Sequence, residues 1–163
     1  MAVSNAKPSA APTALVPEFV MTRVLDAPRS LVFEAWTKPE HLVHWWGRKA
    51  FTMPFCEMDF RPGGVFRLCM RSPAGRDYWV QGVYREIVEP ERIVFTYALE
   101  KEELDHEALL TVLFEEHEGR TTLTLEQALF DPRKAREGAQ GGWIEGLERL
   151  AAYVATKSRE QLP

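Results

Sequence analysis

Apolar and polar residues alternate along several short stretches of the chain, and this pattern predicts a β-sheet. Alternation with a period of two places one set of side chains on a buried face and the other set in water. Turns rich in glycine and proline separate many of these stretches, so neighbouring strands are expected to pair antiparallel as hairpins. The predicted strands cover residues 18–27, 51–61, 65–71, 78–88, 92–99, 108–115 and 121–127.

Two short helices are predicted between the first two strands. The first covers residues 29–36, in which Val32 and Trp36 are four residues apart on one face. The second covers residues 37–46. Thr37 and Glu40 have the spacing of a capping box at its start, and Gly47 is suited to its C-terminal end.

A longer helix is predicted near the C-terminus, over residues 141–157. Asp131 and Pro132 have the order of an N-cap and a first helical residue, so a short helical segment is expected before it. The long helix carries one apolar stripe, made by Trp143, Leu147, Leu150 and Val154. Because an antiparallel sheet needs one face covered, we expect an α+β fold. In this fold a curved antiparallel sheet of about six or seven strands wraps around the C-terminal helix.

The inward faces of the strands predict what lies between the sheet and this helix. They include three tyrosines, Tyr78, Tyr84 and Tyr97, whose hydroxyls need partners if buried. The other inward residues are Cys56, Met58, Phe60, Phe66, Leu68, Met70, Val80, Gly82, Ile93, Phe95, Leu110, Val112, Phe114, Leu123, Leu125 and Gln127. Glycines spaced by four on the helix, at 138, 142 and 146, permit close packing or leave room. Two interpretations therefore stay open: a tightly packed interior, or a cavity that holds a small ligand.

Composition changes this picture little. The chain is 45% hydrophobic, as soluble globular proteins are, and its net charge of -4 gives no electrostatic reason to expect a nucleic-acid partner. Because no run is apolar enough for a membrane span and residues 1–17 lack a signal-peptide pattern, we expect a cytoplasmic protein. Residues 1–17 are expected to be a flexible tail, residues 18–158 a single domain and residues 159–163 a C-terminal tail.

Few side chains suggest catalysis or metal binding. His41 and His44 are three residues apart, as a shared metal would require, but no third ligand accompanies them, so we expect them to face solvent. Glu57 and Asp59 share one strand face, where paired carboxylates can exchange protons, but we expect that face to point outward, beside Arg61. We expect no catalytic residue, no metal and no cofactor.

Several motifs in order resemble one known family. They are VFEAWT at 32–37, PE at 39–40, WWG at 45–47, DFRPGG at 59–64, GVYREI at 82–87, PER at 90–92, GW at 142–143, GL at 146–147 and LAAY at 150–153. Together they resemble the activator of heat-shock-protein ATPase homologues over residues 19–155. That family belongs to the START-like superfamily, also called SRPBCC or polyketide cyclase-like. The resemblance therefore implies the helix-grip fold.

The resemblance also implies candidate functions. START-like proteins bind lipids, polyketides or hormones between sheet and long helix, a few are cyclases or hydrolases, and the eukaryotic namesakes are co-chaperones. We expect non-covalent binding of a small apolar molecule. The expected ligand-binding residues are Trp45, Met58, Phe66, Met70, Tyr84, Phe95, Tyr97, Val112, Trp143 and Leu147. Two alternatives stay open: a protein-interaction module with a chaperone partner or a second copy of the chain, and a cavity enzyme with a pKa-shifted group in its pocket.

Overall fold

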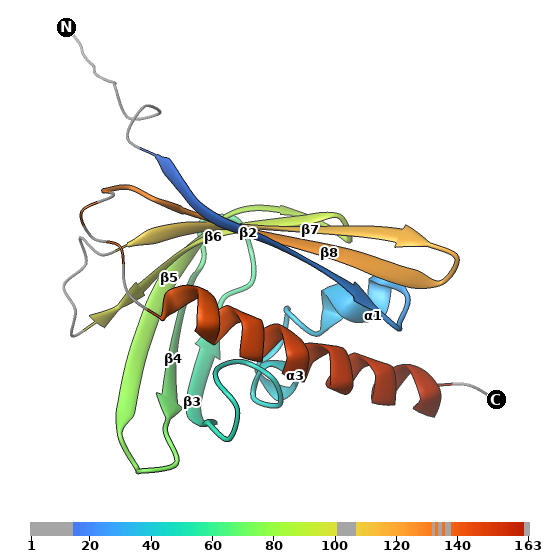
Figure 1. Cartoon of the computed structure of the whole chain (residues 1–163), viewed down its shortest axis with the longest axis horizontal. Helices are drawn as coiled ribbons and strands as arrows, with labels where there is room; N and C mark the ends of the chain where they lie inside the picture. The colour runs from blue at the N-terminus through green and yellow to red at the C-terminus, as the bar shows by residue number, and fades with distance from the viewer. Residues whose placement is uncertain (1–14, 101–106, 132, 134, 136–137, 162–163) are drawn as a thin grey trace, which may run out of the picture.

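The computed structural model describes residues 15–100, 107–131, 133, 135 and 138–161 (Figure 1). The strands are β2 (Val16–Leu25), β3 (Thr52–Met58), β4 (Val65–Arg71), β5 (Asp77–Val88), β6 (Arg92–Leu99), β7 (Ala108–His117) and β8 (Arg120–Leu129). The helices are α1 (Arg29–Glu34), α2 (Pro39–Leu42) and α3 (Ala139–Glu160). Most strand ends therefore lie within two or three residues of the predicted ones.

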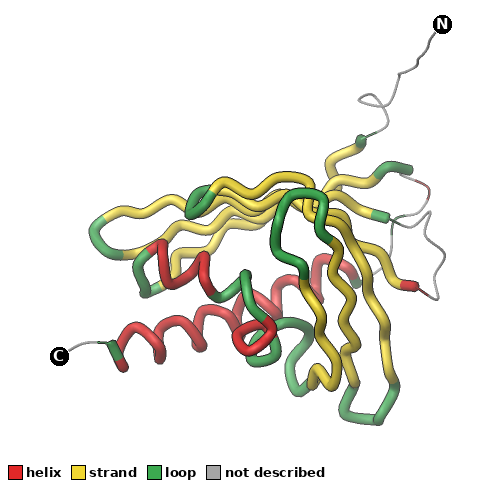
Figure 2. The backbone as a smooth tube through the Cα atoms, turned by 180° about the vertical axis from the view of Figure 1, so that it is seen from behind, coloured by secondary structure: helices red, strands yellow, loops and turns green. Residues whose placement is uncertain are grey.

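The strands form one antiparallel sheet in the order β2-β8-β7-β6-β5-β4-β3. Strand β2 forms one edge and β3 the other, because the chain crosses through α1 and α2 before returning by hairpins to β8. Figure 2 shows that the part of the sheet containing β3, β4 and β5 turns away from the rest, with the helices in the angle between them. The predicted α+β helix-grip architecture is confirmed.

The bend in the sheet is accompanied by an irregularity in β5. The pairing of β5 with β6 shifts register between Tyr84 and Glu86, and such a bulge bends a strand and increases its twist. Nearby, a Cβ atom on Gly82 would overlap the carbonyl oxygen of Thr96 and the ring of Phe66. The Thr96 hydroxyl, although on the outward face, is buried and accepts a hydrogen bond from Val83 N at 2.9 Å.

Helix α3 covers the concave face of the sheet with the predicted apolar stripe. The side chains of Trp143, Leu147, Leu150 and Val154 are buried. The helix begins after Gly138, which adopts φ 89° as the N-cap, and extends a few residues beyond the predicted end. The predicted helical segment at Asp131 and Pro132 falls largely outside the described residues. None of the helices in the described part of the chain is long and apolar enough to cross a membrane.

The predicted capping box at Thr37 is wrong. Lys38 is the N-cap of α2 and makes no side-chain cap, whereas the Thr37 hydroxyl donates to the Glu34 carbonyl at 2.8 Å. The Glu34 carbonyl thus accepts both the backbone N–H and the hydroxyl of Thr37, because a short polar side chain can bond to a preceding carbonyl as well as to a following N–H. Helix α2 is one turn long and ends well before Trp46.

We expect Gly82→Ala to destabilise the protein by about 2–3 kcal/mol, because the added methyl group forces the β5–β6 backbones apart at the bend. Urea unfolding followed by circular dichroism measures this loss. Gly119→Asn is the control: Gly119 has φ 78° and open space around its Cβ position, and asparagine tolerates that conformation. A loss for Gly82→Ala no larger than for this control would contradict the packing argument.

Candidate functional site

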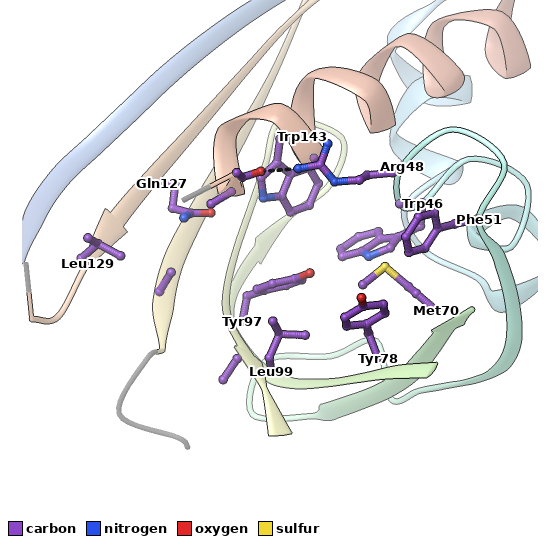
Figure 3. Close-up of a pocket in the computed structure, with 16 residues that line it drawn as sticks. Trp46, Arg48, Phe51, Met70, Tyr78, Tyr97, Leu99, Gln127, Leu129 and Trp143 are labelled. Carbon is purple, nitrogen blue, oxygen red and sulfur yellow. Dashed lines mark hydrogen bonds between the residues drawn. The ribbon is translucent and has the colours of Figure 1, made fainter. Parts of the chain in front are cut away.

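A pocket of about 260 Å³ opens between the N-terminal end of α3 and the strands β4 to β8 (Figure 3). Its walls come from four parts of the chain: the segment between α2 and β3, the sheet, the residue preceding α3, and the first turns of α3. The lining residues are Trp46, Gly47, Arg48, Phe51, Met70, Tyr78, Tyr97, Ala98, Leu99, Ala108, Gln127, Leu129, Gly138, Ala139, Gly142 and Trp143.

Aromatic rings form one wall of the pocket. Trp46 packs edge to face on Trp143, with ring centroids 5.0 Å apart, and stacks on Tyr97 at 6.1 Å. Across the pocket Phe51 lies 6.1 Å from Tyr78. Rings of this kind offer a large apolar surface, and the two tyrosines add hydroxyl groups that can orient a ligand.

Arg48 and Gln127 are polar residues in the lining. Arg48 Nη2 donates to the Gly138 carbonyl at 2.7 Å, and Nη1 donates to Glu145 Oε2 at 3.0 Å. Gln127 is buried, and its Nε2 donates to Glu18 Oε1 at 2.8 Å. Among the described lining residues Arg48 is the only charged one.

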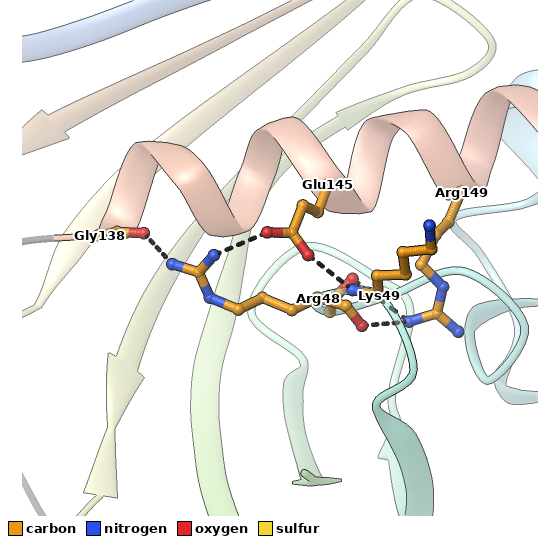
Figure 4. Close-up of polar contacts among 6 residues, drawn as sticks. Arg48, Lys49, Gly138, Glu145 and Arg149 are labelled. Carbon is orange, nitrogen blue, oxygen red and sulfur yellow. Dashed lines mark hydrogen bonds and ion pairs between the residues drawn. The ribbon is translucent and has the colours of Figure 1, made fainter. Parts of the chain in front are cut away.

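Two side chains of α3 hold the segment that carries Trp46 and Arg48 (Figure 4). Glu145 Oε1 accepts a hydrogen bond from Lys49 N at 2.9 Å, and this bond together with the Arg48 guanidinium keeps the pKa of Glu145 below its ordinary value. Arg149 Nη1 donates to the carbonyls of Trp46, Gly47 and Arg48 at 3.2, 3.3 and 3.0 Å. Its Nη2 donates to the carbonyl of His44 at 3.3 Å. Partial burial lowers the pKa of Arg149.

The glycines of α3 make room for this segment. A Cβ atom on Gly146 would lie 3.6 Å from the carbonyl oxygen of Gly47, and one on Gly138 or Gly141 would lie within 3.5 Å of the Arg48 guanidinium. Gly138 and Gly142 also line the pocket. The glycines spaced by four therefore serve both possibilities that the sequence left open, close approach and room for a pocket.

The ten predicted ligand-binding residues fall into three groups in the structure: those that line the pocket, those in the core and those around a second void. Met70, Tyr97 and Trp143 line the pocket. Trp45, Val112 and Leu147 are fully buried in the core, and Met58 is partly buried against it. Phe66, Tyr84 and Phe95 line a second void of only about 10 Å³, which is at the lower limit for one water molecule. Burial raises the pKa of Tyr84, so its phenol stays protonated.

Trp46, not Trp45, faces the pocket. The indole Nε1 of Trp45 donates to the Ala35 carbonyl at 3.0 Å inside the core. Arg48, Phe51 and Gln127 were absent from the predicted set as well. A signal existed for Gln127, because a polar residue at an inward position of an apolar strand needs a partner or a cavity. Arg48 had no such signal, since its contacts are with residues about a hundred positions away.

The histidine pair contacts a tyrosine. His41 Nδ1 lies 2.7 Å from the hydroxyl of Tyr153, and the ring of His44 stacks on Tyr153 with centroids 5.2 Å apart. His44 is exposed as expected, whereas His41 is half-buried because of this contact. No group of three potential metal ligands occurs among the described residues, which do not include His106.

The acidic pair at the C-terminal end of β3 lies outside the pocket. Glu57 and Asp59 are exposed, and Arg61 Nε donates to Asp59 Oδ2 at 2.9 Å, as expected. Both cysteines are free thiols, and burial raises the pKa of the Cys56 thiol to about 11. A thiol with a raised pKa is a poor nucleophile at neutral pH.

Comparison with known proteins identifies relatives of this fold. A family model described as activator of Hsp90 ATPase homolog 1-like protein matches residues 26–155. A solved structure from Chromobacterium violaceum is 27% identical, with a TM-score of 0.76 over 84% of this chain and 96% of the other. An AHSA1-like protein from Aeromonas hydrophila is 18% identical, with a TM-score of 0.70 over 89% and 98%. Among curated proteins, none matches this chain.

We expect alkylation of Cys56 by iodoacetamide to be slow at pH 8 and to keep rising with pH up to 10, because its pKa is about 11. Mass spectrometry of the Cys56 peptide measures the rate in a Cys69→Ser background. In urea the rate should reach half of its plateau near pH 8.5, the pKa of an ordinary thiol. The same midpoint in the folded protein would contradict the burial argument.

We expect Arg149→Met to destabilise the protein by about 2 kcal/mol, because the carbonyls it serves lose charge-assisted hydrogen bonds. Hydrogen exchange should also become faster in residues 44–49. Arg159→Met is the matched control, since Arg159 is exposed near the end of the same helix. It should change stability by less than about 0.5 kcal/mol. Equal effects of the two variants would show that Arg149 does not hold this segment.

Proposed function

The chain belongs to the activator of Hsp90 ATPase homolog 1-like family, and on that premise we propose that it binds a small, largely apolar molecule non-covalently in the pocket beside α3. The fold suits a ligand-binding or interaction domain. One observation carries the proposal: a pocket of about 260 Å³ walled by Trp46, Trp143 and Tyr97. A cavity of about 150 Å³ is enough to bind benzene, so this pocket has room for a substituted or fused ring.

The character of the lining supports binding. Rings and methionine supply apolar contact, worth about 25 cal/mol for each Å² of apolar surface removed from water. Tyr78, Tyr97, Gln127 and Arg48 supply hydrogen-bonding groups that fix an orientation. Within the described lining there is no carboxylate, histidine or thiol, and the phenols of Tyr78 and Tyr97 are the proton-transfer groups present. Non-covalent binding as proposed uses no cofactor.

Self-association through β2 is the second candidate. Val20 and Val24 are 57% and 56% exposed on this edge strand, whose outer backbone groups can pair with another strand. The occupant we propose is a second copy of the chain. Native mass spectrometry of gently purified protein separates the candidates, because it reports both bound small molecules and subunit number.

A substitution that fills the pocket tests the binding proposal. We expect Ala139→Phe to weaken binding of the neutral probe 2-naphthalenemethanol at least about tenfold, because the added ring occupies the pocket. Isothermal titration calorimetry measures the affinity. Ala152→Phe is the matched control, since Ala152 is exposed on the same helix, and it should leave the affinity unchanged. No binding to the unmodified protein, or equal loss in both variants, would overturn the proposal.

A further inference from the structure

We propose that the molecule held in this pocket is an aromatic carboxylic acid whose carboxylate binds Arg48 at the N-terminal end of α3. This inference rests on the proposed function, since it concerns the same pocket. It adds the chemical class of the ligand: a ring that packs on the indoles, and one acidic group that binds the guanidinium.

The charge around Arg48 is the first argument. Its guanidinium lies against the first turn of α3, where Cβ atoms on Gly138 and Gly141 would be 3.1 and 3.5 Å from it. The N-terminal end of a helix carries a partial positive charge, so a cation placed there is next to a charge of its own sign. The first turn of α3 contains no acidic residue, and no side chain of a described residue caps it. An anion at this point would be favoured by both charges.

Glu145 compensates this charge only in part. One carboxylate oxygen receives Arg48 Nη1, while the other receives the backbone N–H of Lys49, whose ammonium is also close enough to act on Glu145. A guanidinium has five N–H groups. Arg48 uses two of its nitrogens toward Glu145 and Gly138, so other N–H groups remain for a ligand as far as the described residues show. The side chain of Arg48 is 40% exposed, which leaves it accessible.

The rest of the lining decides the kind of anion. Trp46, Trp143 and Tyr97 form an aromatic wall of the same pocket (Figure 3). A single guanidinium matches the charge and the planar shape of one carboxylate, with which it can form two parallel hydrogen bonds. No second cation is present among the described lining residues to balance a phosphate dianion. An aromatic wall together with a single guanidinium therefore favours an aromatic monocarboxylate of one or two rings.

Two matched probes, 2-naphthoate and 2-naphthalenemethanol, share a ring system and differ in the acidic group. Comparing their affinities separates the contribution of the carboxylate from that of the rings. By isothermal titration calorimetry we expect the unmodified protein to bind 2-naphthoate about tenfold more tightly than the alcohol, the effect of one charge-assisted pair. Arg48→Gln should abolish this preference, because it weakens the binding of 2-naphthoate about tenfold more than the binding of the alcohol. Arg92→Gln is the matched control, because Arg92 forms a comparably exposed ion pair with Glu86, toward the opposite end of β6 from the pocket-lining Leu99. It should preserve the preference.

Glu145→Gln tests the role of Arg48 through an expected gain in affinity for 2-naphthoate. The amide oxygen still accepts from Lys49 N, but the competing charge is lost, so 2-naphthoate should bind about threefold more tightly and the alcohol equally well. If circular dichroism shows that Arg48→Gln does not fold, Glu145→Gln becomes the test of whether the carboxylate binds Arg48.

The possible outcomes separate the two proposals. If both probes bind equally well, or if the preference for the acid survives in Arg48→Gln, the carboxylate assignment is wrong while the binding function stands. If neither probe binds, both proposals fail. If millimolar inorganic phosphate displaces 2-naphthoate, the anion is a phosphate and the carboxylate assignment is overturned.

Discussion

The pocket depends on the attachment of one backbone segment to one helix. Residues 44–49 follow no regular structure, yet their carbonyls are held by Arg149 and one of their N–H groups by Glu145. Removing a cation from water is costly unless hydrogen bonds replace its hydration, and the four carbonyls around Arg149 do so. The positions of Trp46 and Arg48 follow from this attachment, and so does the width of the pocket.

Packing explains why the pocket lies at the N-terminal end of α3 and not midway along it. Trp36 and Trp45 pack with ring centroids 4.6 Å apart, and Trp36 stacks on Trp143 at 6.3 Å. Phe33 and Phe95 belong to the same buried core. Gly138 and Gly142 line the pocket and contribute no side chain to fill it. The cluster contains an unsatisfied buried donor: the indole Nε1 of Trp36 has no hydrogen-bond partner among the described residues.

Much of the fold could be predicted because it depends on local periodicity. Alternation in β7 and β8 placed Leu110, Val112, Leu123 and Leu125 inside, where all are fully buried. The site was less predictable, because its polar contacts join backbone atoms to side chains far away in the sequence. The WWG run places two indoles side by side in the sequence, but it does not reveal that Trp45 bonds inside the core while Trp46 faces the pocket. That difference depends on where α2 ends, and Gly47 predicted an end at Trp46, whereas α2 ends at Leu42.

Glu145 reaches Lys49 through a backbone N–H, and Arg149 reaches residues 44–48 through backbone carbonyls. Main-chain groups are common to almost every amino acid, so the path of this segment tolerates many replacements of its side chains. Phe51 takes no part in these contacts, so its side chain can be exchanged without removing them. Such an arrangement marks residues 46–51 as the place to retarget the pocket by design.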